Sequence, residues 1–177
     1  MQPHLRSALT LAVLLGVLLI GVAWAWSAVT EPFPEREKAA TCTTRLVAKG
    51  DKVYPDQVTV SVLNGGTREG LADRTMTDLV TAGLDRGFVD NAPDDAEVTL
   101  AQVWADDPGN PAVKLVKSYL GKRAKIVRRE STLPGVTVVV GDDFPGVVNG
   151  RKAVKAQDDA TICSPPEDEE LDELDDL

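Results

Sequence analysis

The sequence contains a single histidine, His4, which lies within the first seven residues. Histidine is the usual general base of nucleophilic triads and a common zinc ligand. Its absence from the rest of the chain excludes a His-based triad and a His-ligated metal site there. We therefore expect neither a cofactor nor a metal site.

The glycine-rich segment Asn64 to Ala72, NGGTREGLA, lacks the residues of a nucleotide-binding loop. A P-loop needs lysine and then a hydroxyl residue after its last glycine, but Leu71 and Ala72 stand there, and the glycine spacing does not match a dinucleotide fingerprint. Either the free N–H groups of this loop hold an anion at a helix N-terminus, or its glycines form a tight turn, which is the favoured interpretation. The residues concerned are Asn64, Gly65, Gly66 and Gly70.

Aromatic residues are scarce, at 5% of the chain, whereas valine and alanine are abundant. A core of branched aliphatic side chains packed on a sheet is therefore expected. About 125 residues remain between the N-terminal apolar run and the acidic C-terminal segment, which is the size of one domain. We place this domain at residues 42–163.

Residues 8–29 contain no charged side chain. Roughly 20 apolar residues in a helix cross a hydrocarbon core of about 30 Å, and Trp24 and Trp26 at the end of the run suit the headgroup region. The run predicts one transmembrane helix. The alternative is a cleaved signal peptide, whose apolar stretch is usually shorter.

The charges that flank this run predict its orientation. Arg6 precedes it, whereas Glu31, Glu35 and Glu37 follow it, and the positively charged side of a membrane helix stays inside. Residues 1–7 are therefore expected in the cytoplasm, and the domain is expected outside, after a proline-containing linker at residues 30–41. The predicted localisation is the cell membrane, with a single pass.

The two cysteines, Cys42 and Cys163, lie near the two ends of the expected domain. In an oxidising compartment such a pair is expected to form a disulfide, which would tie the ends of the domain together. The alternative is a pair of buried thiols.

The formal net charge of −9 is concentrated at one end of the chain. Residues 167–177 read EDEELDELDDL and carry eight acidic side chains, so the remaining residues sum to −9 + 8 = −1. Such a dense block of like charges predicts a disordered acidic tail, which we place at residues 164–177. Leu171, Leu174 and Leu177 leave open a short helix that binds a partner.

Alternating valines predict a strand at Gln57 to Leu63, and a helix is predicted from Thr67, as its N-cap, to Gly83, as a left-handed C-terminal cap. A second helix is predicted from the N-cap Asn110 and Pro111 to Gly121. Further strands are predicted at Thr43 to Lys49, Gly87 to Asp90, Val98 to Trp104, Lys125 to Arg128 and Val136 to Val140. This order predicts an α+β fold of βαββαβ type, with two helices on one face of a mixed sheet.

Three carboxylate pairs occur in the domain, and all lie in turns beside proline or glycine. A glycosidase needs two carboxylates from separate places that face one cleft, which these pairs do not indicate. Turn formation explains them. The pairs are Asp94/Asp95, Asp106/Asp107 and Asp142/Asp143.

Seven basic residues fall within sixteen positions that contain no acidic residue. Outside a cell such a cluster could bind an anionic wall polymer or lipid phosphate, although solvated helix and strand faces would have the same composition. The residues are Lys114, Lys117, Lys122, Arg123, Lys125, Arg128 and Arg129.

The segment VSVLNGGTREGLADRTMTDLVTAGL resembles the start of the C-terminal domain of LytR/CpsA/Psr proteins, in which a valine-rich strand runs into an Asn-Gly-Thr-Gly-x-x-Gly-Leu-Ala loop and a helix. Gly66 and Thr67 hold the family's Thr-Gly in reversed order. The resemblance resumes at Ala112 to Gly121 and at Val136 to Phe144, and it covers Val58 to Phe144. The matching positions of the first segment are Val62, Leu63, Asn64, Gly65, Gly70, Leu71, Ala72 and Gly83.

The resemblance does not extend to the catalytic domain of that family, which transfers glycopolymers to peptidoglycan. A transmembrane helix followed by the C-terminal domain is similar to the stand-alone envelope integrity proteins of actinobacteria. The resemblance implies a non-enzymatic protein that supports envelope integrity, by binding wall polymer or a wall-assembly protein and not nucleic acid. The alternative is an enzyme of glycopolymer metabolism that uses an unrecognised carboxylate site.

Overall fold

The computed structural model of the protein describes residues 13–20, 22 and 42–166, and the chain divides into a unit that ends at Ala39 and one that begins at Ala40. In the first unit, residues 13–20 are helical and their leucine and valine side chains are exposed. Among the described residues, no helix combines the length and apolar character needed to cross a membrane.

Several segments predicted from the sequence lie wholly or largely outside the described residues. These are the cytoplasmic segment 1–7, most of the transmembrane run 8–29, the linker 30–41 and, within the tail, residues 167–177. The membrane anchor and residues 167–177 of the acidic tail therefore stay predictions, but the predicted start of the tail is wrong, because Ser164 is the buried last residue of a strand, Ala160–Ser164.

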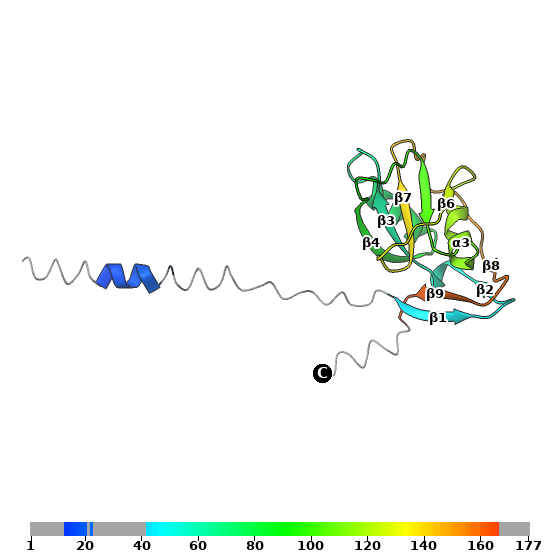
Figure 1. Ribbon diagram of the computed structural model, residues 1–177, viewed down its shortest axis with the longest axis horizontal. Coiled ribbons are helices and arrows are strands. Elements are labelled where there is room, and N and C mark those ends of the chain that lie inside the picture. The colour runs from blue at the N-terminus through cyan, green and yellow to red at the C-terminus, as the bar shows by residue number, and fades with distance from the viewer. Residues whose placement is uncertain (1–12, 21, 23–41, 167–177) are drawn as a thin grey trace, which may run out of the picture. The chain divides into compact units, whose positions relative to one another are not determined.

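Within the second unit, residues 42–166 form a five-stranded mixed sheet and two α-helices (Figure 1). These elements are β3 (Thr59–Asn64), α2 (Leu71–Thr81), β4 (Asp85–Asn91), β5 (Ala101–Trp104), α3 (Pro111–Tyr119), β6 (Lys125–Val127) and β7 (Val136–Val140). Two small antiparallel ribbons and a 3-10 turn complete the unit: β1 (Thr43–Val47) with β9 (Ala160–Ser164), β2 (Lys52–Val53) with β8 (Val154–Lys155), and η1 (Pro55–Gln57).

The strand order of the main sheet is β4-β3-β7-β5-β6. β3 runs parallel to both β4 and β7, β5 runs parallel to β6, and β5 and β7 are antiparallel. Each helix therefore connects two neighbouring parallel strands, at opposite edges of the sheet. The units β3-α2-β4 and β5-α3-β6 run in opposite directions and extend toward opposite edges. Right-handed crossovers in both units therefore place both helices on the same face of the sheet.

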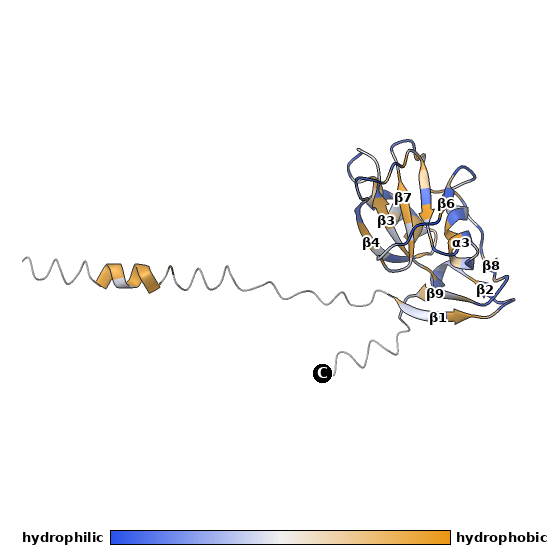
Figure 2. Cartoon of the chain, viewed as in Figure 1, coloured by the Kyte–Doolittle hydropathy of each residue, from blue (hydrophilic) through white to orange (hydrophobic). Residues whose placement is uncertain are grey.

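The core lies between the helices and that face of the sheet. Met76 and Leu79 of α2, Leu115 and Val116 of α3, and inward residues of β3 such as Val62 are fully buried in one cluster. The other face carries a smaller cluster around Trp104 and Val139. Figure 2 shows the strands of the main sheet as mostly hydrophobic and the loops as hydrophilic. The predicted α+β class, the mixed sheet and the aliphatic core are confirmed.

The predicted start of the first helix is wrong. Thr67 does not cap it, because α2 begins at Leu71 and its N-cap is Gly70, with φ +67° and no side-chain cap. The N–H groups of Thr67 and Arg68 are bonded instead to Asp142, which follows β7. The predicted end is correct, since Gly83 has φ +98° and the Leu84 N–H donates to the Leu79 carbonyl in the manner of a Schellman cap.

The strand predicted from Val98 begins only at Ala101. The Thr99 and Leu100 carbonyls accept from the N–H groups of Asp143 and Gly141, so the chain bends there against the end of β7. The segment predicted at Thr43 to Lys49 does form β1, but it pairs only with β9 and stays outside the main sheet.

Candidate functional site

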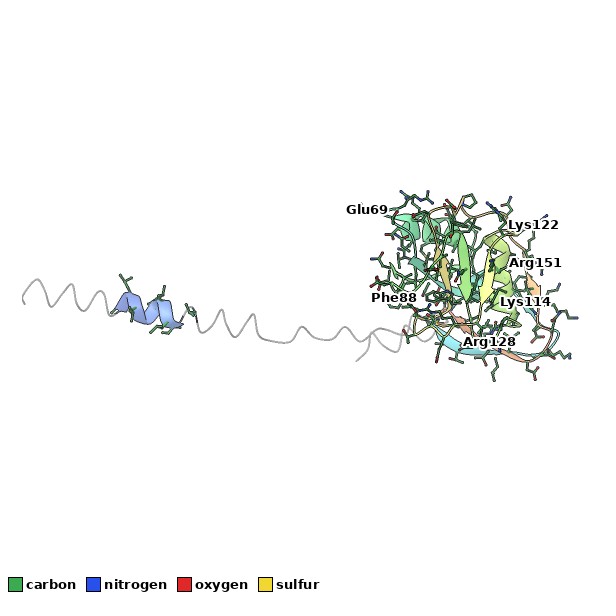
Figure 3. All side chains as sticks on the ribbon, turned by 45° about the horizontal axis from the view of Figure 1, so that its top comes forward. Glu69, Phe88, Lys114, Lys122, Arg128 and Arg151 are labelled. Atoms are coloured by element: carbon green, nitrogen blue, oxygen red, sulfur yellow. A yellow bond between two sulfur atoms is a disulfide. The ribbon has the colours of Figure 1, made fainter. Side chains whose placement is uncertain are left out.

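A hollow of about 690 Å³ lies on the outer side of α3. Four cationic side chains line it, from Lys114, Lys117, Lys122 and Arg151, and no carboxylate is among the described lining residues. Figure 3 shows Lys114, Lys122 and Arg151 along the same side of the domain. We call this feature the basic hollow; its other lining residues are Ser118, Gly121, Ile126, Val148, Asn149, Gly150 and Gln157.

Helix α3 positions two of these cations. Asn110 is its N-cap and accepts a hydrogen bond from the Ala112 N–H at 2.9 Å, and Pro111 holds the first helical position, as predicted. Lys114 and Lys117 are three residues apart and so lie on one side of the helix. The Lys114 Nζ donates to the Gln157 side chain at 3.1 Å.

Lys122 follows the end of this helix. Gly121 takes φ +85°, the left-handed conformation that turns the chain out of α3. Ile126 of β6 and Val148, which is 45% exposed, add apolar surface between the cations. The basic hollow therefore presents both positive charge and apolar carbon to a ligand.

The loop 145–152 supplies Arg151 and is fixed against α3 by its backbone. The Arg151 N–H donates to the Ser118 hydroxyl at 2.9 Å, the Tyr119 hydroxyl donates to the Arg151 carbonyl at 3.0 Å, and the Val148 N–H donates to the Tyr119 carbonyl at 2.8 Å. A Cβ on Gly150 would lie 2.6 Å from the Tyr119 ring, so only glycine allows this approach. Burial raises the pKa of the Tyr119 phenol above its ordinary value.

The structure separates the predicted basic cluster into parts. Lys114, Lys117 and Lys122 line the basic hollow, but Arg123, Lys125, Arg128 and Arg129 do not. Strand alternation explains why Lys125 lies outside the hollow. Ile126 packs against the helix-side core, whereas Val127 packs against the cluster on the opposite face, and Lys125 shares the face of Val127.

Arg129 belongs to a separate structural contact. Its guanidinium lies 4.2 Å from the centre of the Trp104 ring and bonds both oxygens of Asp95 at 2.9 and 3.0 Å. The hydrogen bond from Arg129 lowers the pKa of Asp95. Arg129 is therefore committed to the far face of the sheet.

The family-motif loop, residues 64–70, is closed around an internal carboxylate. The Thr67 N–H lies 2.9 and 3.0 Å from the two Asp142 oxygens, the Thr67 hydroxyl donates to Oδ2 at 2.9 Å, and the Arg68 N–H donates to Oδ1 at 3.0 Å. The hydrogen bonds from Thr67 and Arg68 lower the pKa of Asp142. Asp142 thus occupies N–H groups that a bound anion would need, and of the three loop glycines only Gly70 has a positive φ.

The remaining loop residues maintain this turn. The Asn64 side chain donates to the Arg68 carbonyl at 2.9 Å and accepts from the Gly66 N–H at 3.1 Å. A Cβ on Gly66 would collide with the Asp142 carboxylate and lie 2.9 Å from its backbone nitrogen. Gly65 lies against Val139 and Val98, and its N–H donates to the Val140 carbonyl. The candidate loop is therefore a structural joint between β3 and β7.

The carboxylate pairs do not come together in the described part of the chain. Asp107 accepts from the Gly109 N–H at 2.7 Å, as a turn residue does, while Asp95 pairs with Arg129 and Asp142 closes the loop. Within residues 13–20, 22 and 42–166 there is no group of three or more acidic, cysteine or histidine side chains that could hold a metal ion.

The predicted disulfide is present. Cys42 and Cys163 are bonded, with their Cα atoms 5.4 Å apart, beside the pairing of Thr44 with Cys163 in the β1–β9 ribbon.

Sequence reasoning missed Arg151, Ser118 and Gln157 as parts of the site. Arg151 and Gln157 lie more than twenty residues beyond the basic cluster, in a stretch without helical or strand periodicity. The only local signal was the basic pair Arg151-Lys152 after the dipeptide Asn149-Gly150.

Three comparisons relate this chain to known proteins. No curated protein matches it. A similar solved structure is the soluble domain of a conserved hypothetical secreted protein from Mycobacterium marinum, with 22% identity, a TM-score of 0.42, and coverage of 56% of this chain and 76% of that one. Residues 57–144 match the family model described as LytR cell envelope-related transcriptional attenuator. This segment runs from the end of η1 past β7, and over these residues the chain belongs to the LytR C-terminal domain family.

Proposed function

We propose that this protein is a non-enzymatic, membrane-anchored module outside the cytoplasm, and that it supports the cell envelope by binding an anionic wall polymer in the basic hollow. The observation that carries the proposal is the lining of the hollow, where four cations meet no carboxylate among the described residues. The family description, which refers to the cell envelope, supports the setting.

The charge of the hollow suits a repeating anion better than a single small one. Lys114, Lys117 and Lys122 end in flexible ammonium groups that act as point charges, whereas Arg151 offers a planar fork to phosphate or carboxylate. Ile126 and Val148 give apolar contact for the carbon backbone of a polymer. An open cleft of one sign of charge also raises the local concentration of oppositely charged ligands.

The disulfide supports the proposed compartment. Disulfides persist in oxidising surroundings and are rare in the cytosol, so a bridge between Cys42 and Cys163 favours a domain outside the cytoplasm. The apolar run 8–29, which contains no charge, supports attachment to the membrane.

Two carboxylates of the predicted pairs fit the enzymatic alternative poorly. A general acid needs a raised pKa, but hydrogen bonds from the Thr67 and Arg68 N–H groups lower the pKa of Asp142, and Arg129 lowers that of Asp95. Both carboxylates hold other parts of the fold in place.

The proposal is tested with the full chain in nanodiscs of neutral lipid, with fluorescent inorganic polyphosphate and polygalacturonate as phosphate-bearing and carboxylate-bearing probes. Lys117→Gln with Lys122→Gln should weaken binding about tenfold at an ionic strength of about 0.02 M, and less at about 0.15 M. The control is Arg74→Gln with Arg86→Gln, which removes the same charge from α2 and β4, at the opposite edge of the sheet. It should leave binding nearly unchanged.

If both double variants lose affinity for the probes equally, binding depends on net charge and not on the basic hollow, and the proposal is wrong. If neither probe binds, and cross-linking in cells attaches a wall-assembly protein to the hollow lysines, the ligand is a protein. Identification of which probe binds more tightly defines whether phosphate or carboxylate is preferred.

A further inference from the structure

The four cations of the basic hollow have no anionic partner within the described part of the chain. The Lys114 Nζ bonds the neutral Gln157, and none of Lys114, Lys117, Lys122 and Arg151 forms one of the ion pairs that the described residues show. The basic hollow therefore concentrates positive charge that no acidic side chain of the described residues neutralises.

The same chain carries the complementary sequence. Residues 167–177 contain eight carboxylates and no basic residue, and leucine recurs at every third position, at Leu171, Leu174 and Leu177. The carboxylates match the lysines and arginine of the hollow, and the leucines match the apolar surface of Ile126 and Val148.

Chain length permits this segment to reach the hollow. Gln157, which lines the hollow, is nine residues before Pro166, so the two are at most about 32 Å apart. Residues 167–177 extend up to about 40 Å. The hydrogen bond of the Asn110 side chain to the Thr161 carbonyl, at 2.8 Å, further holds β9 against the start of α3.

A tethered segment competes at an effective concentration near the millimolar range. We infer that residues 167–177 occupy the basic hollow when no external polyanion is bound, so that a wall polymer must displace them. The regulatory half of this inference rests on the proposed function, whereas the docking of the tail does not.

Docking is tested directly by zero-length carbodiimide cross-linking of the full chain in nanodiscs without polymer, followed by mass spectrometry. Carboxylates of residues 167–177 should link to Lys114, Lys117 and Lys122 at least fivefold more than to Lys49, Lys52 and Lys155, which do not line the hollow. Even linkage to all six lysines would overturn the inference. Links between isotopically labelled and unlabelled copies would also overturn it, because the occupant would then be a second copy.

Competition is tested by replacing every Glu with Gln and every Asp with Asn in residues 167–177. Affinity for polyphosphate should rise roughly three- to tenfold at an ionic strength of about 0.02 M, and this gain should disappear when Lys117→Gln and Lys122→Gln are added. The same tail changes in the Arg74→Gln, Arg86→Gln background should keep the gain.

The two hypotheses fail in different ways. Polyphosphate binding that requires the hollow lysines but ignores the tail overturns the inference and leaves the proposed function intact. Specific tail cross-links without polymer binding support docking and overturn the proposed function.

Discussion

At the scale of single residues, Asp142 determines what the glycine-rich loop can do. A loop of this shape, with converging N–H groups before a helix, ordinarily suits an anion, and here the anion is a side chain of the protein itself. Exchanging Asp142 together with Asp143 would therefore disturb the loop as well as any chemistry.

Asp142→Asn should lower the melting temperature by roughly 3 to 6 °C at pH 7, because it removes the charge that the Thr67 and Arg68 N–H groups stabilise. The pKa of Asp142 is lower in the folded chain than the ordinary unfolded value of about 3.9. Its contribution is therefore present above that value and is lost as the pH falls through the folded pKa. The difference from the wild type should narrow below about pH 4.

The matched control for this prediction is Asp143→Asn. The Asp143 side chain makes none of the hydrogen bonds or ion pairs that the described part of the chain shows, so this change should leave the melting temperature almost unaltered at every pH. Calorimetric melts of both variants between pH 2.5 and 7 make the comparison. A constant difference across that range would contradict the role assigned to the Asp142 charge.

Only those residues of the basic hollow that are close together in the chain could be grouped from the sequence. Lys114 and Lys117 could be placed together because helical spacing is local, and Lys122 follows the same helix. Arg129 was grouped with them wrongly, because its partners Trp104 and Asp95 are 25 and 34 residues earlier in the chain. Arg151 was missed because a tertiary contact with Ser118, not a sequence pattern, brings it to α3.

At the scale of elements, one helix has ends set by neighbouring residues, and the other has a start set by a residue distant in the chain. α3 follows its prediction, since Asn110, Pro111 and Gly121 all act within one turn of its ends. The N-cap of α2 lies three residues later than predicted, at Gly70 and not at Thr67, because Asp142, 75 residues from Thr67, binds the N–H groups ahead of it. The ribbon strands β2, β8 and β9 were not predicted, because β2 and β8 have only two residues each and Ile162 is the only large aliphatic residue of β9.

The attachment of the loop 145–152 to α3 is the element contact that forms the basic hollow. Ser118→Ala with Tyr119→Phe removes the two side-chain hydroxyls that hold the Arg151 backbone, while it keeps the helix and the phenyl ring. Amide hydrogen exchange should become faster in residues 145–152, and polyphosphate affinity should fall about threefold, because Arg151 is less well positioned.

Thr77→Ala is the control for this pair. The Thr77 hydroxyl donates to the Asp73 carbonyl at 2.9 Å on the exposed side of α2, where it holds no loop. This variant should change neither the exchange of residues 145–152 nor the affinity. Unchanged exchange in the double variant would show that the hydroxyls do not fix the loop.

At the scale of the whole molecule, the family segment and the site only partly coincide. Residues 57–144 include the entire main sheet and both helices, but Val148, Arg151 and Gln157 of the basic hollow lie after this segment. The sheet within the family segment is therefore not sufficient for the hollow, which also needs the residues between this segment and β9. The β1–β9 ribbon then joins the two ends of the domain.

This ribbon depends on the disulfide. In β1 only Val47 is buried, and Leu46 is 82% exposed, so the five residue pairs with β9 contribute much of what holds the strand. Cys42 and Cys163 are 121 residues apart, and in the chain-entropy model closing a loop of that length stabilises the folded state by about 4 to 5 kcal/mol. The bridge is thus the strongest single constraint on the ends of the domain.

Cys42→Ser with Cys163→Ser should lower the free energy of unfolding in urea by up to about 5 kcal/mol, and chemical reduction of the wild type should have the same effect. The loss of stability should differ between segments of the domain, because β1 buries little side-chain surface. Amide exchange should accelerate most in β1 and β9, and least in β3 and β7 at the centre of the main sheet. If the variant unfolds at the wild-type urea concentration, the bridge contributes no stability, and backbone pairing with β9 alone must hold β1 in place.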